Sequence, residues 1–484
     1  MAYKDLREYI DILDANGELL RVQAQVDWNL EIGAITRHAM DLRAPAPLFE
    51  NIKDCPKGFR ILGLPVGPSK PNLHGRMALA LGLNKDTKAK QMIGIFRNRL
   101  NNPIKPKVIS DAPCKENIMK GDDVDVLKFP SPLVHSTDGS RYLGTWHLCI
   151  TKSQAEGWVN WAIYRIAVHN KNTLGLNLHE KMQHGGKMYY TEYDKNDKPM
   201  PIALAIGTEP VTTISGATSF PYGADQPSLT GGLREASVEM VKCETVDLEV
   251  PASSEIVIEG EVPPGLTMEE GPFGEFTGHT GSGRYPKPVI KIKCVTYRNN
   301  PILPVTNMGK PWDDDSVCES ITRSAMTVKI LQDSDLPVRS AFCYHGYLMV
   351  ISSESRPRLV QRVVEALNNA KCRSLSYWTI IVNEDVDPTD STDVMWSLAT
   401  RTNPGTGIHV ERRPFVNELY PLLTPEERKN RNSSRAYLDS TFPPDWPEEY
   451  KKEHCQVIDF ERAWPKELQK EVLKKWKEYG FSSE

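Results

Sequence analysis

Two glutamates, Glu270 and Glu275, lie five residues apart in the stretch E-G-P-F-G-E-F-T-G-H-T-G-S-G-R-Y-P, residues 270–286. This stretch is too rich in glycine and proline for a helix, because its glycines free the backbone and Pro272 fixes one bend. Such a loop can aim both carboxylates at one small volume. Facing carboxylates raise each other's pKa, so that one can stay protonated near neutral pH and act as a general acid. The alternative is a hairpin that carries two solvated acids.

Further polar candidates lie upstream, in V-N-W-A-I-Y-R-I-A (159–167) and in Q-H-G-G (183–186). Asn160 and Arg165 belong to a strand-like piece, and residues an odd number apart point to opposite faces of a strand. We therefore expect one of them to bind a phosphate or metal while the other reaches the acids. The alternatives are an amide satisfied by a turn at Asn160, a surface ion pair at Arg165 and a turn-capping histidine at His184.

Composition narrows the class of protein. The 484 residues are enough for two or three domains, and 39% hydrophobic with 25% charged residues is typical of a soluble globular protein. A net charge of −4 without a basic block argues against non-specific nucleic-acid binding. No apolar run reaches the roughly 20 residues that span a bilayer, and the charged N-terminus is not a signal peptide. Nine scattered cysteines without a C-x-x-C pair exclude a zinc ribbon and favour a reduced cytoplasm.

The hydrophobic period changes twice along the chain, which predicts α/β regions on either side of a β-rich one. Helical spacing in the first part gives way near residue 113 to short β pieces, which suggest a β-barrel or closed β domain with one helix at 228–241. The predicted divisions are an N-terminal α/β region (1–112), a β-rich cofactor domain (113–312), a linker helix (313–332), a C-terminal α/β domain (333–462) and an amphipathic terminal helix that contacts another subunit (463–484).

Several motifs occur in an order that resembles one family. They are N-W-A-I-Y-R, Q-H-G-G, T-G-G-L-R, V-K-C-E-T-V-D-L-E-V-P-A-S-S-E-I-V-I-E-G, E-G-P-F-G-E-F-T-G, Y-R-N-N-P-I-L-P and N-E-D-V-D. Nearly the whole chain is similar to the UbiD family of (de)carboxylases that use prenylated FMN. A-P-C-K-E-N-I, G-T-W-H-L-C-I-T-K and W-K-E-Y-G-F look closest to its anaerobic aromatic branch, which includes phenylphosphate and aryl carboxylases and hydroxybenzoate decarboxylases.

The resemblance implies a multi-domain α/β and β fold whose cofactor domain is a flavin-reductase-like split barrel. It also implies a reversible, non-oxidative carboxy-lyase acting on a small aromatic, phenolic or aryl, carboxylic acid and CO₂. Arg165, Glu270 and Glu275 match the catalytic residues of the family, with Glu275 at the position of the proton donor. The cofactor-binding positions of the family fall on Asn160, Ile163, Tyr164, Arg165, His184 and Gly185.

The resemblance implies a metal as well. Asn160 and His184 match ligands of a manganese or magnesium ion that bridges protein and cofactor phosphate, with potassium nearby; hard oxygen-rich sites suit such ions. Two positions depart from the family. Its metal-binding glutamate falls on Gln226, so the metal binds more weakly, Asp225 substitutes, or the phosphate is held otherwise. A lysine that contacts the phosphate falls on Tyr377.

Three hypotheses follow. The first is an active aromatic (de)carboxylase, which needs a flavin prenyltransferase to supply its cofactor and forms a homo-oligomer, dimer or hexamer, with or without related subunits. The second is a non-catalytic accessory subunit of a multi-subunit carboxylase, which Gln226 and Tyr377 favour and the Arg165, Glu270 and Glu275 set opposes. The third, a plain flavin oxidoreductase, has no supporting feature. We expect the substrate pocket to draw on residues 310–320, 343–347 and 433–440.

Overall fold

The first helix begins where its sequence supplies a cap. In the computed structural model, which describes residues 2–180, 183–370, 376–413, 416–417 and 419–482, α1 (Leu6–Ala15) starts after Asp5, whose side chain accepts a 2.9 Å hydrogen bond from the Glu8 backbone. Its apolar residues recur at helical spacing and are buried together. The amphipathic pattern read from the sequence is therefore the pattern that builds the N-terminal core.

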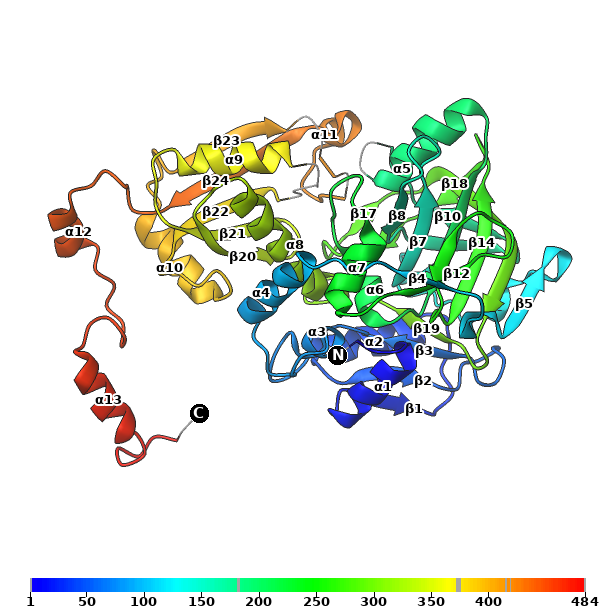
Figure 1. The fold of residues 1–484 in the computed structure, drawn as a ribbon, viewed down its shortest axis with the longest axis horizontal. Coiled ribbons are helices and arrows are strands. Elements are labelled where there is room, and N and C mark those ends of the chain that lie inside the picture. The colour runs from blue at the N-terminus through cyan, green and yellow to red at the C-terminus, as the bar shows by residue number, and fades with distance from the viewer. Residues whose placement is uncertain (1, 181–182, 371–375, 414–415, 418, 483–484) are drawn as a thin grey trace.

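A four-stranded sheet forms the N-terminal layer, in the order β1-β2-β3-β19 (Figure 1). Its fourth strand, β19, comes from about 240 residues further along the chain and pairs in parallel with β3. The N-terminal sheet is thus completed by a segment that the sequence analysis placed in the central region. The elements of this layer are β1 (Leu19–Val22), β2 (Ala46–Phe49), β3 (Arg60–Gly63), β19 (Ile302–Val305), α2 (Glu31–Asp41), α3 (Gly75–Ala80) and α4 (Ala89–Leu100).

The central region is a ten-stranded sheet whose main path runs β6-β9-β10-β18-β14-β11-β7-β8, with β15 and β5 also paired to β18. Neighbouring strands pair antiparallel, and β18 is the long central strand against which most of the site is built. The strands are β5 (Asn117–Lys120), β6 (Tyr142–Gly144), β7 (His147–Lys152), β8 (Val159–Ala162), β9 (Ile166–Asn170), β10 (Thr173–Leu176), β11 (Met200–Ile206), β14 (Ile256–Val262), β15 (Thr267–Glu270) and β18 (Tyr285–Tyr297).

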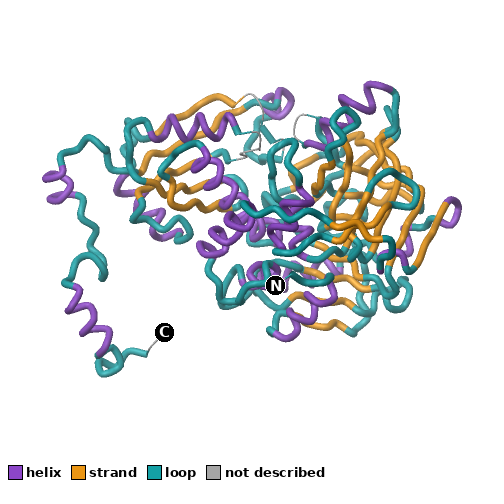
Figure 2. The backbone as a smooth tube through the Cα atoms, viewed as in Figure 1, coloured by secondary structure: helices purple, strands orange, loops and turns teal. Residues whose placement is uncertain are grey.

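This central sheet is strongly curled (Figure 2). Strands β6 and β7 are six positions apart in the sheet, which is about 29 Å in a flat sheet with a spacing of about 4.8 Å. Only Thr145 and Trp146 connect them, and so short a link reaches about 11 Å at most. The sheet must therefore bend into a half-barrel. Among the described strands no ladder joins β6 to β8, so the predicted closed β domain is an open one, and the split-barrel assignment stays a prediction.

Helices and small sheets cover the ends of the half-barrel. The helix predicted at 228–241 is shorter: α7 ends at Arg234, where Glu235 takes a left-handed conformation (φ 58°), and the chain continues as a strand. Apolar residues that suggested a longer helix instead join a second core under this strand. The elements are α5 (His184–Met188), α6 (Pro210–Ala217), α7 (Gln226–Arg234), β4 (Lys107–Ile109), β12 (Glu239–Lys242), β13 (Glu249–Pro251), β16 (Phe273–Gly274) and β17 (Thr280–Ser282).

A long helix, α8 (Asp314–Asp333), joins this part to the C-terminal sheet. Its first half packs into the N-terminal core through Val317 and Ile321, and its second half packs into the C-terminal core through Val328 and Leu331. The C-terminal sheet has the order β20-β21-β22-β24-β23. Its elements are β20 (Val338–Tyr344), β21 (Leu348–Ser353), β22 (Trp378–Asn383), β23 (Ile408–Arg413), β24 (Ser433–Ser440), α9 (Leu359–Asn369), α10 (Ser391–Arg401) and α11 (Pro425–Asn430).

The chain ends in an arm that leaves the rest of the molecule (Figure 1). The arm carries α12 (Glu448–His454) and α13 (Lys466–Lys474), so the helix expected over 464–480 is shorter, and residues 483–484 of the predicted terminal segment lie outside the described part. Gln469 is the buried residue of α13, while its apolar residues Leu468 and Leu473 are exposed. Within the described ranges, no helix is both long and apolar enough to cross a membrane.

Candidate active site

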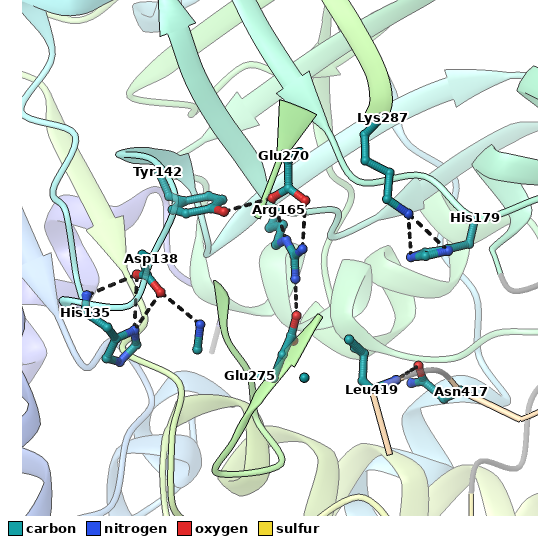
Figure 3. A network of polar contacts seen from close by, with 12 residues as sticks. His135, Asp138, Tyr142, Arg165, His179, Glu270, Glu275, Lys287, Asn417 and Leu419 are labelled. Atoms are coloured by element: carbon teal, nitrogen blue, oxygen red, sulfur yellow. Dashed lines mark hydrogen bonds and ion pairs between the residues drawn. The ribbon is translucent and has the colours of Figure 1, made fainter. Parts of the chain in front are cut away.

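Arg165 holds both predicted acids (Figure 3). Its Nε and Nη2 donate to the two oxygens of Glu270, each at 2.8 Å, in a bidentate pair, and its Nη1 donates to Glu275 Oε1. All three residues are buried, with 9%, 1% and 5% of their surfaces exposed. Paired carboxylates and a planar guanidinium form short, charge-assisted bonds of fixed geometry. The structure therefore brings the three residues proposed from the sequence into one contact set.

The two carboxylates of this set differ in their environment. Glu270 also accepts a 2.8 Å hydrogen bond from the hydroxyl of Tyr142, so three hydrogen bonds converge on this carboxylate. Burial, with Glu270 next, raises the pKa of Tyr142, which keeps that hydroxyl a donor. Burial opposes the charge of Arg165, but Glu275 and Glu270 together raise its pKa above the usual value. One guanidinium between two carboxylates allows the pair of acids to share one proton.

The loop between the two glutamates is held by main-chain geometry. Glu270 ends β15, which pairs with β18, and Gly271 then turns the chain with φ 82°, a conformation that favours glycine. Gly139 lies directly against this turn, because a Cβ on it would meet Gly271 O at 2.0 Å. A second turn follows, in which the Glu275 backbone donates to His279 O at 3.0 Å. The two acids are therefore aimed by the backbone and not by flexible side chains alone.

Asp138 fastens the same loop to the neighbouring segment (Figure 3). It accepts hydrogen bonds from the Gly274 backbone at 2.9 Å and from the His135 backbone at 3.0 Å. The His135 ring lies 3.2 Å from Asp138 and 2.8 Å from the Asn307 amide oxygen. Although burial lowers it, the pKa of His135 is raised overall by Asp138. This network fixes the position of the residue that precedes Glu275.

The contact set closes one end of a cavity of about 290 Å³, near the lower limit of ligand pockets. The cavity lies between the half-barrel, α8 and the C-terminal sheet. Its wall combines apolar, polar and charged residues. The residues that line it include Thr145, Asn160–Arg165, Asn177, His179, Gln183, His184, Gly216–Phe220, Gln226, Phe273, Glu275, Phe276, Met308, Asp315, Glu319, Arg323, Asn417, Leu419 and Arg431.

Most of the predicted cofactor-binding residues line this cavity. The lining residues among them are Asn160, Ile163, Tyr164, Arg165 and His184. Asn160 and Arg165 thus line the same cavity, although strand alternation predicted that their side chains would point to opposite faces. The rule fails because β8 ends at Ala162 and β9 begins at Ile166, so residues 163–165 are not part of a regular strand. Gly185 is not among the lining residues; its backbone donates to the Tyr164 hydroxyl at 3.0 Å, which also accepts from Asn160.

Gln226 lies at the predicted metal position with both amide atoms engaged. Its oxygen accepts from the Trp161 backbone N–H and its nitrogen donates to the Trp161 carbonyl, each at 2.7 Å. Asp225, the suggested substitute, caps α7 through Ser228 and is exposed. None of the three metal candidates Asn160, His184 and Gln226 is a carboxylate. The described residues contain no group of three His, Cys, Asp or Glu side chains placed to hold a metal.

Residues outside the strands of the C-terminal part, in loops and in α11, lie against the acid loop. Tyr377, at the position of the expected lysine, stacks on Tyr420 with ring centroids 3.8 Å apart, and its hydroxyl accepts from the Asn417 backbone at 3.1 Å. Arg428 donates to Gly281 O at 3.0 Å. Of the expected pocket segments, 310–320 contributes Asp315 and Glu319, whereas 343–347 and 433–440 are absent from the described lining.

Sequence reasoning missed several of these groups. Tyr142 lies 128 residues from Glu270 and Asp138 lies 136 residues from Gly274, and no local pattern pointed to either contact. The α8 side chains Asp315, Glu319 and Arg323 could have been found, because a spacing of four residues on a helix places them on one face.

Comparison with known proteins identifies relatives along the whole chain. Residues 10–95, 107–311 and 318–440 match the models of the N-terminal, Rift-related and C-terminal domains of UbiD, described as 3-octaprenyl-4-hydroxybenzoate carboxy-lyase. The pyrrole-2-carboxylic acid decarboxylase of Pseudomonas aeruginosa is 31% identical over 496 residues, covering 99% of this chain and 98% of the relative. These matches extend across the N-terminal, central and C-terminal sheets.

Two solved structures have the same architecture. The vanillic acid decarboxylase of Sedimentibacter hydroxybenzoicus in closed form is 29% identical, with a TM-score of 0.89 and 99% of each chain covered. An evolved dimeric form of the UbiD-class enzyme HmfF from Pelotomaculum thermopropionicum, in complex with prFMN, is 26% identical with a TM-score of 0.76, covering 92% of this chain and 96% of that one.

Proposed function

From the premise that this chain belongs to the UbiD family of carboxy-lyases, we propose that it releases CO₂ from an aromatic carboxylic acid, and adds CO₂ in the reverse direction, with prenylated FMN as cofactor. The observation that carries the proposal is the Arg165 clamp on Glu270 and Glu275 at the end of a mixed apolar and polar cavity. An acid–arginine–acid set of this kind positions one transferable proton beside a bound ring.

The cavity suits a flavin. Ile163, Phe220 and Met308 supply apolar surface, residues 216–219 line the wall beside them, and Arg165 lies at the end where the acids are. When bound, prenylated FMN supplies the electron-accepting chemistry that C–C cleavage requires. The protein binds and orients the ring, excludes water and moves the proton. A prFMN complex of the relative HmfF supports the choice of cofactor.

Glu275 is the proposed proton donor. In decarboxylation the bond between the ring carbon and the carboxylate carbon breaks, the electron pair stays with the ring carbon, and a proton from Glu275 takes the place of CO₂. In carboxylation Glu275 removes that proton. Glu270, stabilised as an anion by Arg165 and Tyr142, keeps the guanidinium in place through both directions.

The accessory-subunit alternative rests on Gln226 and Tyr377, both of which are engaged in protein contacts. One experiment separates the two readings: the protein is produced together with a flavin prenyltransferase, its absorption spectrum is recorded, and CO₂ release is measured with a panel of aromatic acids. Bound prenylated flavin and turnover support the enzyme. Purified protein without either supports the accessory subunit.

Manganese or magnesium, with potassium, is the proposed partner of the cofactor phosphate, held by Asn160 and His184. Gln226 joins them only by sharing the oxygen that already accepts from Trp161. We expect Gln226→Glu to raise manganese affinity about 10–100-fold, because a charged ligand replaces a neutral one. Titration calorimetry of chelator-treated protein, with FMN binding followed by fluorescence, measures this without turnover. Gln91→Glu, on the exposed end of α4, is the control. Equal affinities in Gln226→Glu and wild type would mean that the phosphate is held without this position.

The terminal arm is the proposed subunit contact. Large apolar residues on it are exposed: Trp446, Tyr450, Ile458, Phe460, Trp464, Leu468, Leu473, Trp476, Tyr479 and Phe481. An arm with so much exposed apolar surface gains stability by covering it on a second copy. We expect light scattering to give a multiple of 54.5 kDa, and the double variant Ile458→Lys/Leu473→Lys to lower that mass. Leu422→Lys, at an exposed site off the arm, is the matched control. A wild-type mass of one chain would refute the contact.

A further inference from the structure

The helix α8 presents three charged side chains to the cavity, opposite the acid loop. Asp315, Glu319 and Arg323 follow one another at four-residue intervals and all line the cavity that Glu275 also lines. Glu319 and Arg323 are ion-paired, and Arg323 also donates to Gly346 O at 2.9 Å. The Arg323 guanidinium is thus bound to protein groups. Asp315 lies one helical turn before Glu319.

Two carboxylate groups on this wall have hydrogen-bonding capacity that the described residues do not fill, one on the buried Glu319 and one on the half-buried Asp315. Glu319 is only 7% exposed, yet its Oε2 has no hydrogen-bond partner within the described ranges. The carboxylate of Asp315 likewise has no hydrogen bond to the part of the chain that the structure describes, although it lines the cavity. A buried polar group left unsatisfied costs about 1–3 kcal/mol, so such groups in a binding cavity indicate a ligand that completes them.

The charges of the cavity select among ligands. Burial, Glu319 and Asp313 raise the pKa of Asp315 well above its usual value, and burial also raises the pKa of Glu319. A carboxyl oxygen can accept a hydrogen bond whether or not the group carries a proton. A second anionic group on the ligand would meet acidic oxygens here, and Arg323 is already bound to Glu319. A neutral group that carries a hydrogen is the complementary partner.

We propose that Asp315 and Glu319 recognise a hydrogen-bond donor on the aromatic ring of the substrate, a hydroxyl or a ring N–H. The inference rests on the proposed function and narrows its substrate class to ring acids that carry such a donor. Acids whose ring offers only a methylated oxygen or nitrogen leave the two carboxyl groups unpaired and are poor substrates.

Matched substrates test this directly. The flavin-loaded protein is assayed with 4-hydroxybenzoate against 4-methoxybenzoate and with pyrrole-2-carboxylate against 1-methylpyrrole-2-carboxylate. We expect kcat/KM to favour the donor-bearing member of at least one pair about 100-fold or more, because a site built for a hydrogen bond rejects the analogue that lacks it. Binding of the same acids, followed by the change in flavin absorption, gives a second measurement that does not depend on turnover.

Variants assign the preference to residues. Asp315→Leu removes the polar group, and we expect the preference within the pair to fall to a few fold, chiefly through a higher KM for the donor-bearing acid. Asp315→Asn keeps hydrogen-bonding atoms and restores part of the preference. Because the replaced carboxyl has no protein partner, Asp315→Leu is expected to fold with unchanged or higher thermal stability. Asp333→Asn, exposed at the far end of the same helix, is the control.

The outcomes separate the two levels of the argument. Turnover of no aromatic acid by flavin-loaded protein overturns the proposed function and this inference with it. Equal turnover and binding of both members of each pair overturns the inference and leaves the function standing. A preference that survives unchanged in Asp315→Leu means that another part of the cavity recognises the donor, and the role of Asp315 is then wrong.

Discussion

Glu275→Gln is expected to lower turnover of an aromatic acid about 10²–10⁴-fold, while the protein still folds and binds its flavin. Glutamine keeps the shape of the side chain and can still accept from Arg165 Nη1, but it carries no transferable proton. General acid–base steps contribute rate factors of this size. The turn that positions the residue uses its backbone N–H and carbonyl, and these remain in the variant. Steady-state CO₂ release measures the effect.

Exchange of the ring hydrogen of the product with deuterated water gives an independent test. That exchange needs the reverse proton transfer, so it should slow in Glu275→Gln to a similar extent as turnover. Glu269→Gln is the matched control, because this neighbour of Glu270 on β15 is exposed and faces away from the cavity wall. If Glu275→Gln turned over substrate within a few fold of wild type, the proton would have to come from Glu270 or from the substrate itself.

The two acids of the site could be predicted from the sequence because the residues between them indicate a turn. Glycine and proline between Glu270 and Glu275 disfavour a helix and allow a tight turn, and Gly271 adopts the positive φ that the turn requires. The contact of Arg165 with these acids joins segments more than 100 residues apart, so no local pattern can predict it. It was predicted by resemblance and not by periodicity, since the periodicity argument separated Asn160 from Arg165, and the break in the strand at residues 163–165 reverses that conclusion.

Other parts of the site depend on contacts that no local pattern reveals. Tyr142 reaches Glu270 because the half-barrel curls, and the curl follows from the short link between β6 and β7, which is visible only once the strand order is known. The fourth strand of the N-terminal sheet is a similar case, because β19 pairs with β3 across about 240 residues. The five divisions of the chain predicted from the sequence stay predictions, because contacts such as the pairing of β19 with β3 cross them.

The sequence predicted the positions of helices better than their lengths. An amphipathic pattern marks where a helix can form, but its end is set by what it packs against. The helix predicted to reach residue 241 gives way to β12, whose apolar residues are buried in a sheet core. The terminal helix is about half its expected length, and of its described residues only Gln469 is buried. By contrast α8 was predicted almost to the residue, since its whole length is packed.

Arg165→Met is expected to lower both stability and activity more than any other single change at the site. Removing the guanidinium leaves Glu270, 1% exposed, with the Tyr142 hydroxyl as its remaining donor among those found here. Breaking a buried ion pair from one side costs about 3–5 kcal/mol, because an uncompensated charge stays in a dry environment. Urea unfolding should therefore show a lower midpoint, and CO₂ release should fall at least as far as in Glu275→Gln.

A second substitution separates the two effects. In Arg165→Met/Glu270→Gln the buried charge is gone and Tyr142 keeps an acceptor, so most of the lost stability should return, as expected when both partners of a buried pair are replaced. Activity should not return, because Glu275 has lost its hydrogen bond from Arg165 Nη1. Arg339→Met, which breaks an exposed pair with Glu354, is the control and should change the midpoint little. Recovery of both stability and turnover in the double variant would show that Arg165 serves only to neutralise Glu270, and the proposed role in orienting the proton donor would then be wrong.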